Sequence, residues 1–437
     1  MNDLRRWAGV VARVALGCGR GIVIGLALAW LPIAGAIVSP AHAAGEPQPF
    51  AAFLQSLWPE AQALGVSRTS FDRELKGLTP DLKLPDLVLP GRTRETSGGQ
   101  AEFTKTPLEY LNVGYLDKLA EQGRRLKVQH ADALGRIERA LGVDRHILLA
   151  IWGRETAYGN YKLPHDALQV LATQAYLGRR KDMFRKEFLY GLKMLDDKVV
   201  SRPAFKSSWA GAVGMTQFLP SEYYALAYDL NGDGRKDIWN SVTDALASAA
   251  NQLKQKGWVE GQPWGFEVRL PAGPSCLYEG IPNTRKTLDW VKLGVVRAGG
   301  RAIPKELEAT DAFILTPGGA HGPAFLVFEN FMVLKRYNFA DLYAVFVGQL
   351  ADRMAGGPNF EAPWTTPKML TTRELEEIQE RLKAKGLPIE KIDGKAGMNT
   401  RNLIGQYQKS SKLAVDCWPS ETVLRHVRGG VATGVAP

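Results

Sequence analysis

A single glutamate interrupts an apolar stretch in the first half of the chain. Glu155 follows Leu148 and Ile151 at helical spacing in residues 147–159, so the three side chains share one face of an expected helix. Asp144 is expected to cap this helix, and the glycine at the end of the stretch to close it. A carboxyl group held against apolar side chains loses hydration, which raises its pKa and allows it to act as a general acid near neutral pH. The alternative is a buried glutamate that pairs with a distant arginine.

A second stretch, residues 207–220, combines small residues with neutral polar ones. Gly211 and Gly214 permit a close backbone approach or a positive φ. Ser208 and Gln217 supply neutral hydrogen-bonding groups of the kind that hold sugar hydroxyls and amides. The same pattern is also compatible with a plain tight turn between two helices.

Together the two stretches resemble the lytic murein transglycosylase B family, whose enzymes cut bacterial peptidoglycan. The shared pattern is Gly-x-Glu-Thr-x-x-Gly, followed later by Ser-x-Ala-Gly-Ala-x-Gly-x-x-Gln-Phe-x-Pro, and the resemblance extends over residues 50–354. It implies a lysozyme-like fold in which Glu155 is the single catalytic acid and base. It also implies that the substrate groove is lined by Ser208, Gln217, Tyr337 and Asn338.

The resemblance implies a reaction that needs no cofactor for its chemistry. Glu155 would protonate the oxygen between N-acetylmuramic acid and N-acetylglucosamine, then take the proton of the muramyl 6-hydroxyl as a 1,6-anhydro ring closes. Most glycosidases use two carboxylates, and the two motif stretches offer one. Two alternatives stay open: a goose-lysozyme-like muramidase, in which water replaces the 6-hydroxyl, and a non-enzymatic wall-binding scaffold.

Residues 229–240 fit the start of an EF-hand calcium loop, with oxygen ligands at positions 1, 3 and 5 and a glycine at position 6. Position 12 is Asn240, where a bidentate glutamate is usual. The related family completes its loop with an aspartate slightly further on, but this chain has one extra residue before Asp244. The alternative is a turn without metal. The expected ligands of a structural calcium ion are Asp229, Asn231, Asp233, Arg235 and Asp244.

The pair Arg179 and Arg180 follows a glycine within a helical segment. Two adjacent arginines most simply lie on a solvated face, and they could also meet an anionic group of a substrate. Both are therefore candidate substrate-binding residues.

The elements that would position these residues are mostly helical. Apolar residues recur at helical intervals in residues 50–78, 108–141 and 165–198, with interruptions of the second segment near Gly114 and Gly135. Three β-prone runs predict a small inserted sheet, and a helix follows it. Those runs are residues 266–270, 312–315 and 324–328, and the helix spans 339–354. The expected fold class is α+β, mainly α.

A Pro/Gly-rich linker at 355–367 separates the catalytic domain, residues 44–354, from a C-terminal module at 368–430. The module has one amphipathic helix around Gln379, a loop at 393–400 and another helix after it. This arrangement resembles the three-helix peptidoglycan-binding module. A simple helical packing unit is the alternative.

The first 43 residues resemble a signal peptide, with arginines before an uncharged apolar run at 22–38 and Ala-His-Ala at the expected cleavage site. The expected location is the periplasm, and an uncleaved anchor in the inner membrane is the alternative.

The net charge of +10 suits a polyanionic partner. The expected partner is peptidoglycan rather than nucleic acid, and association with other cell-wall enzymes is possible. Cys276 and Cys417 are the cysteines that remain after cleavage, and the sequence leaves their pairing open.

Overall fold

The computed structural model describes residues 49–89, 101–273, 275–365 and 368–429. The expected signal peptide, residues 1–43, lies outside these ranges. Among the helices that are described, none has both the length and the hydropathy to span a bilayer.

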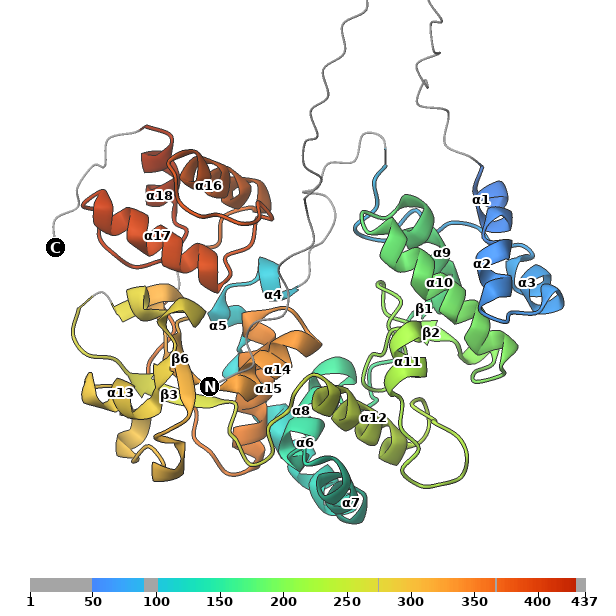
Figure 1. Ribbon diagram of the computed structural model, residues 1–437, viewed down its shortest axis with the longest axis horizontal. Coiled ribbons are helices and arrows are strands. Elements are labelled where there is room, and N and C mark those ends of the chain that lie inside the picture. Colours follow the sequence, from blue (N-terminus) through green and yellow to red (C-terminus); the bar gives the residue numbers. More distant parts are fainter. Residues whose placement is uncertain (1–48, 90–100, 274, 366–367, 430–437) are drawn as a thin grey trace, which may run out of the picture. The chain divides into compact units, whose positions relative to one another are not determined.

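Helix α8 (Arg145–Thr156) carries Glu155 and is buried along most of its length. It begins where the Asp144 side chain accepts hydrogen bonds from the amides of His146 and Ile147, as the sequence predicted. A helix that is apolar nearly all round must be surrounded by other elements. It packs against the following helices, which lie around it in Figure 1. These are α6 (Val113–Gln129), α7 (Ala131–Leu141), α12 (Val242–Gln255) and α15 (Asp341–Met354).

The predicted interruptions of the segment before α8 lie at other residues than expected. Gly114 and Gly135 are inside α6 and α7. The breaks occur instead at Asn112, whose side chain accepts from the amide of Tyr115 and caps α6, and at His130 between the two helices. A capping side chain therefore sets the boundary where a nearby glycine was expected to do so.

A second group of helices has its own apolar core. The segment expected to be helical at 165–198 forms two of its members, which are separated at residues 178–180. Gly178 has an extended backbone and ends the first of them, and the position requires glycine because a Cβ there would lie 2.4 Å from the carbonyl oxygen of Gln174. The group contains α1 (Phe50–Ser56), α2 (Trp58–Ala63), α3 (Arg68–Leu75), α9 (Ala167–Leu177), α10 (Lys181–Asp196) and α11 (Pro220–Leu226).

The predicted sheet is present between α12 and α14 (Glu329–Tyr337), and its strands are antiparallel in the order β4-β6-β7-β3-β5. Alternate residues face opposite sides. Phe313 and Phe325 join the core around α8, whereas Ile314 and Leu326 pack on the other face with α13 (Thr287–Lys292). The strands are β3 (Gly265–Arg269), β4 (Arg285–Lys286), β5 (Val296–Arg297), β6 (Asp311–Leu315) and β7 (Ala324–Val327).

Three helices with a separate core follow residue 368: α16 (Thr372–Ala384), α17 (Met398–Ser410) and α18 (Glu421–Val427). The buried Gln379 ties the loop before α17 to α16. Its side-chain oxygen accepts from the amides of Asp393 and Gly394, both at 2.9 Å. Its nitrogen donates to the hydroxyl of Thr400 at 3.2 Å.

The segment expected to be a linker packs against the sheet as far as Thr365. The Glu267 carboxylate accepts from the amides of Glu361 and Ala362, both at 2.8 Å. Trp364 is buried, and the Thr365 amide donates to the His321 carbonyl at 2.7 Å. This part of the segment is therefore not a free tether.

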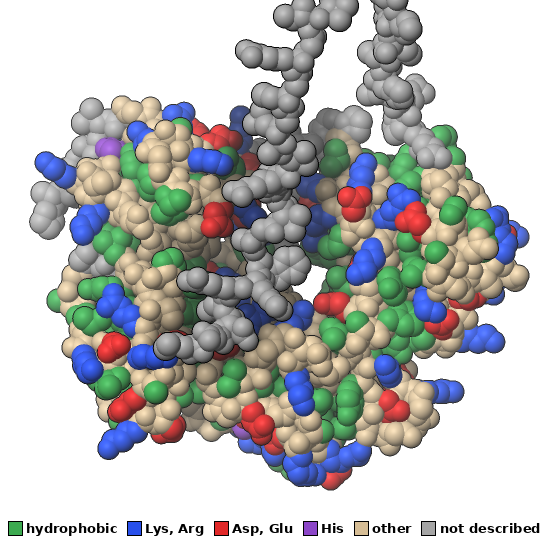
Figure 2. Space-filling view, in the orientation of Figure 1, with side chains coloured by type: hydrophobic (Ala, Val, Ile, Leu, Met, Phe, Trp, Pro, Cys, Tyr) green, Lys and Arg blue, Asp and Glu red, His purple; other side chains and the backbone are tan. Residues whose placement is uncertain are grey.

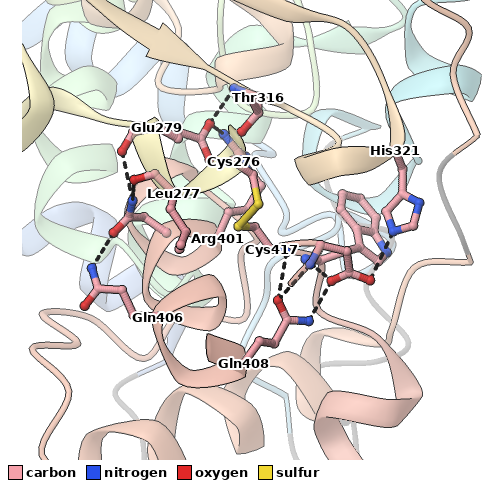
Figure 3. The surroundings of a disulfide bond; sticks show 12 residues. Cys276, Leu277, Glu279, Thr316, His321, Arg401, Gln406, Gln408 and Cys417 are labelled. Carbon is pink, nitrogen blue, oxygen red and sulfur yellow. Dashed lines mark hydrogen bonds and ion pairs between the residues drawn. A yellow bond between two sulfur atoms is a disulfide. The ribbon is translucent and has the colours of Figure 1, made fainter. Parts of the chain in front are cut away.

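The pairing that the sequence left open is resolved, because Cys276 and Cys417 form a disulfide. Cys276 belongs to the short helix η3 (Ser275–Tyr278) beside the sheet, and Cys417 precedes α18. The bond therefore fastens the three C-terminal helices to the sheet region (Figure 3).

Candidate active site

Helix α8 ends one residue beyond Glu155, in a tight turn of left-handed residues. Tyr158 in this turn has a φ of 60°, which non-glycine residues rarely adopt. Packing holds it there: a Cβ on Gly153 would lie 2.6 Å from its ring, and its hydroxyl donates to the Leu119 carbonyl at 2.9 Å. The glycine expected to close the helix, Gly159, thus lies three residues beyond the last helical one.

Glu155 as a whole residue is partly exposed, but protein atoms shield its carboxyl group from most of the solvent. Burial raises its pKa to about 7, although a hydrogen bond from Tyr343 and the charge of Arg154 act in the opposite direction. The negative charge of Glu102 adds to the rise. A carboxyl with this pKa exists in both protonation states near neutral pH, so it can donate a proton and later accept one.

Tyr343 of α15 lies directly against the catalytic candidate. Its hydroxyl donates to Oε1 of Glu155 at 2.6 Å, and the residue is 1% exposed. Burial and the nearby Glu155 charge hold the pKa of Tyr343 well above 10, so it stays a neutral donor. No sequence motif predicted a role for this residue. The apolar pattern of its helix gives no sign that this one tyrosine points at Glu155.

Arg154 and Glu102 form a charged pair beside Glu155 and were also missed. The Arg154 guanidinium lies 3.5 Å from a carboxylate oxygen of Glu102, which belongs to α4 (Ala101–Thr104). It donates two hydrogen bonds to the hydroxyl of Tyr110 in α5 (Pro107–Tyr110), at 3.0 and 2.7 Å. No local motif marks Glu102, because its partner is 52 residues away in the chain.

The stretch 207–220 folds as a compact loop that follows the short ladder of β1 (His165–Asp166) and β2 (Lys206–Ser207). The loop glycines behave as predicted. Gly211 has a φ of 80°, and a Cβ there would lie 2.2 Å from Leu171. Gly214 has a φ of 73°, and its Cβ would lie 2.8 Å from Ile238. Other residues at these two positions would be strained and would also clash.

Two of the loop's carbonyl groups connect it to the elements around Glu155. The Thr156 hydroxyl donates to the Met215 carbonyl at 2.9 Å, and the Tyr337 hydroxyl donates to the Thr216 carbonyl at 2.5 Å. The Tyr337 ring is stacked on that of Tyr343, with 6.1 Å between the centroids and 9° between the planes. The loop, the end of α8 and the corner between α14 and α15 are therefore joined around one carboxyl.

The predicted substrate residues lie on these joined elements. The Ser208 hydroxyl accepts from the Ala212 amide at 3.3 Å and is partly exposed. Gln217 has a φ of 58°, and its side-chain nitrogen donates back to the Gly214 carbonyl at 3.1 Å. Asn338 ends α14 and is also partly exposed. Their contacts with a sugar stay a prediction.

Arg179 and Arg180 lie elsewhere, at the start of α10, and both face Asp86. Their guanidinium nitrogens are 3.3 and 3.7 Å from its carboxylate oxygens. The pair thus fixes the segment around Asp86, whose neighbour Leu87 forms a β-bridge with Gly178. A role toward a substrate stays a prediction for both arginines.

Three aspartates converge in the predicted calcium loop. One carboxylate oxygen from each of Asp229, Asp233 and Asp244 lies within 4.8 Å of the others. Asp244 is fully buried in the first turn of α12, so the extra residue before it does not carry it out of reach. Its carboxylate accepts hydrogen bonds from the amides of Leu230 and Asp237, at 3.2 and 3.3 Å. An oxygen set of this kind fits calcium.

The remaining loop positions divide into two groups. The Asn231 side-chain oxygen accepts from the amide of Asp233 at 2.9 Å, which places it within the loop, and the Arg235 amide donates to Asp233 at 2.8 Å. Asn240 at position 12 turns to Asp237 instead, at 3.3 and 3.1 Å. Asp244, and not Asn240, therefore has its carboxylate beside those of Asp229 and Asp233, and its role as a calcium ligand stays a prediction.

Lys and Arg side chains are scattered over the face drawn in Figure 2 and form no single basic patch there. Nucleic-acid sites usually concentrate basic residues on one face.

Comparison with known proteins identifies the family. Residues 49–352 match the family described as transglycosylase SLT domain. The membrane-bound lytic murein transglycosylase B of Escherichia coli K12 is 32% identical over 241 residues, which are 52% of this chain and 61% of that protein. The chain thus matches about three fifths of the length of this relative.

Solved structures agree with that match. SltB3 of Pseudomonas aeruginosa, in complex with NAG-anhNAM-pentapeptide, is 36% identical with a TM-score of 0.78, over 87% of this chain and 100% of that one. Escherichia coli Slt35 in complex with calcium is 26% identical with a TM-score of 0.56, over 70% and 93%. The expected lysozyme-like, mainly helical fold with a small sheet is confirmed. The family match covers well over half of the sequence and includes Glu155 and the loop at 207–220, and this chain belongs to the transglycosylase SLT domain family.

Proposed function

We propose that this protein is a lytic murein transglycosylase, which cleaves the β-1,4 bond between N-acetylmuramic acid and N-acetylglucosamine in peptidoglycan. The observation that carries the proposal is the environment of Glu155. Burial raises the pKa of this carboxyl to about 7, and the hydrogen bond that it accepts comes from a neutral tyrosine. One residue can then act as acid in the first step and as base in the second.

The proposed reaction consumes no water. Glu155 donates its proton to the bridging oxygen as the bond from that oxygen to the muramyl anomeric carbon breaks. The muramyl 6-hydroxyl then attacks the same carbon and gives its proton to the Glu155 carboxylate. The sugar ends in a 1,6-anhydro ring, and Glu155 is protonated again. The 6-hydroxyl belongs to the reacting sugar, so it has a large effective-concentration advantage over water.

Neutral groups would hold the sugars in this reaction. Ser208, Gln217, Tyr337 and Asn338 are the proposed substrate contacts, because they lie on the elements joined around Glu155. The SltB3 complex supports the substrate class, since its ligand contains anhydromuramic acid. Peptidoglycan is therefore the proposed substrate and partner.

A muramidase is the competing function. Glu102 is the residue that favours it, because it is a second carboxylate near Glu155. A hydrolase would be expected to use a second carboxylate to activate water, and the charge of Glu102 acts on Glu155. However, the Glu102 carboxylate faces the Arg154 guanidinium at 3.5 Å, which favours a structural role.

Product analysis separates the two functions. Purified sacculi are digested in ¹⁸O-water, and the soluble fragments are weighed. A transglycosylase gives unlabelled anhydromuramyl ends, about 18 Da lighter than the matching hydrolysis products because no water is added. Dominant reducing ends that carry ¹⁸O would establish a muramidase.

A structural calcium ion, export and wall binding complete the proposal. Side-chain oxygens of Asp229, Asn231, Asp233 and Asp244 and the backbone carbonyl of Arg235 would hold the ion, which would neutralise the converging carboxylates. Slt35, a relative, was solved in complex with calcium. We further propose that the chain is exported to the periplasm and that α16, α17 and α18 bind the cell wall.

A further inference from the structure

A buried cluster of charges lies at the corner between α14 and α15. Asp341 begins α15 and is 8% exposed. Its carboxylate oxygens lie 2.7 Å from the Lys335 ammonium of α14 and 3.0 Å from the Arg401 guanidinium of α17. The amide of Met398 donates to the same carboxylate at 3.1 Å. The corner of the catalytic domain is thus held by one of the C-terminal helices.

Arg401 is almost fully buried, and each of its three guanidinium nitrogens donates a hydrogen bond. It forms two hydrogen bonds with Glu279, at 3.0 and 2.5 Å, and a third with the Ala396 carbonyl at 2.6 Å. Glu279 itself is fully buried and accepts from the Thr316 amide at 2.9 Å. Arg401 therefore joins the sheet region, through Glu279, to the start of α15, through Asp341.

Docking of α17 has other supports. The disulfide between Cys276 and Cys417 lies next to the Arg401 cluster (Figure 3). The side chain of Asn402 donates to the carbonyls of Leu277 and Glu279, at 3.2 and 3.0 Å. Because these contacts do not involve the guanidinium, substitution of Arg401 alone leaves the C-terminal helices covalently attached.

The held corner carries the groups around Glu155. Asp341 is in the same first turn of α15 as Tyr343, whose hydroxyl donates to the Glu155 carboxyl. Lys335 is in the same last turn of α14 as Tyr337, whose ring stacks on Tyr343. A shift of Asp341 therefore moves the tyrosine that contacts the catalytic carboxyl.

We propose that Arg401 is a positioning residue for catalysis, which holds Asp341 so that the Tyr343 hydroxyl stays on the Glu155 carboxyl. The three C-terminal helices then belong to the scaffold of the active site, apart from any binding of the wall. This inference rests on the proposed function only in taking Glu155 as the catalytic acid.

The effect of Arg401 on Glu155 can be measured through the pKa of Glu155, which depends on the groups around its carboxyl. The groups that face Glu155 come from five elements. They are Arg154 of α8, Glu102 of α4, Tyr110 of α5, Tyr337 of α14 and Tyr343 of α15. Arg401 acts on Glu155 through Tyr343. Because the hydrogen bond from Tyr343 lowers the pKa of Glu155, losing it moves the alkaline limb of the activity profile to higher pH.

A double-mutant cycle tests the inference. The pH profiles of kcat and kcat/KM on soluble glycan strands are measured for the wild type, Arg401→Gln, Tyr343→Phe and the double variant. We expect Arg401→Gln to lower kcat about tenfold or more, since small displacements of catalytic groups cost this much, with little change in KM. Its alkaline limb should move to higher pH, and Arg401→Gln should add no further shift in the Tyr343→Phe background.

Arg428→Gln is the matched control, because Arg428 is an exposed arginine of the C-terminal helices that pairs with Glu377. It should leave kcat and the pH profile unchanged. If Arg401→Gln does not fold, Asp341→Asn is used in the same cycle, since it keeps the pair between Arg401 and Glu279. Wild-type kcat and pH profile in a folded variant would overturn the inference, as would a shift that persists without the Tyr343 hydroxyl. Reducing ends that carry ¹⁸O, released by the wild type, would refute the proposed transglycosylase activity. The double-mutant cycle would still test the positioning role of Arg401, because Glu155 would remain the catalytic acid.

Discussion

The hydroxyl of Tyr343 lies 2.6 Å from Oε1 of Glu155 and donates a hydrogen bond to it. The two residues are 188 positions apart in the chain, yet helices α8 and α15 pack against each other so that Tyr343 is buried and contacts Glu155. A neutral donor at this place orients the carboxyl without removing its proton. Burial still dominates, so the pKa of Glu155 stays at about 7.

Glu155→Gln should abolish cleavage of sacculi, by at least about 10²- to 10⁴-fold, because the amide can neither donate nor accept the proton. Release of soluble fragments measures this loss, and circular dichroism checks the fold. A correctly folded Gln variant that still solubilises sacculi would remove Glu155 from the mechanism.

The same variant should change how stability depends on pH. The folded protein raises the Glu155 pKa from 4.5 to about 7, so the wild type loses stability as pH rises through this window. Glutamine does not ionise, and Glu155→Gln should therefore be more stable than the wild type above pH 7, by on the order of 2 to 3 kcal/mol. Chemical denaturation at pH 5 and pH 8 tests this. Equal differences at both pH values would contradict the raised pKa.

Glu102→Gln should leave the enzyme active but shift its pH profile. The Glu102 charge raises the pKa of Glu155, so its removal lowers that pKa and moves the alkaline limb of kcat/KM to lower pH. In a muramidase that uses Glu102 as the base for water, the same change would instead cost most of the activity. Rate measurements between pH 5 and pH 9 distinguish the outcomes.

Calcium should raise the melting temperature, and EDTA should lower it, because an ion that binds only the folded loop stabilises it by mass action. Asp244→Asn should remove this response, since Asp244 is the buried member of the oxygen cluster. Asp237→Asn is the matched control, because its side chain accepts from the amides of Trp239 and Asn240 instead. If neither calcium nor EDTA changed the melting temperature of the wild type, the loop would be a turn without metal.

Removal of all residues after Gly357 should destabilise the catalytic domain. A free module could be removed harmlessly, but this truncation takes away Arg401, which pairs with the buried carboxylates of Glu279 and Asp341. It also takes away Cys417, the disulfide partner of Cys276. We expect a lower melting temperature and reduced kcat on soluble glycan. A truncated protein with wild-type stability and kcat would show that the helices act only as a wall anchor.

The sequence identified those parts of the site that local chemistry marks. Glu155 stands out because it interrupts an apolar face, and Gly211 and Gly214 because no other residue tolerates their positions. Asp244 was predicted as a ligand because a calcium loop without its last ligand needs another carboxylate nearby, and its carboxylate does lie close to those of Asp229 and Asp233. Each of these signals lies within about fifteen residues of the chain, which is the range that patterns of spacing can cover.

Tyr343, Glu102 and Arg401 show why the remainder was missed. Each acts through a contact with a residue far away in the chain, and each has an ordinary local pattern: a tyrosine in an apolar helix, an acid in a short helix, an arginine in an amphipathic one. Only tertiary packing brings them to the same carboxyl or the same corner. The packing of the expected linker against the sheet could not be predicted for a similar reason, because its Pro/Gly content does not reveal that Trp364 is buried.

The disulfide has a consequence for the biosynthesis of the protein. Cys276 and Cys417 are 141 residues apart, so the bond encloses strands β4 to β7, both helices of the α14–α15 corner and α17, whereas β3 precedes the ring. This covalent ring cannot close until almost the entire chain has been synthesised. It forms in an oxidising compartment and not in a reducing cytosol. We therefore expect protein produced under reducing conditions to unfold at a lower temperature than the oxidised form, because the Cys276–Cys417 bond no longer supports the docking of α17.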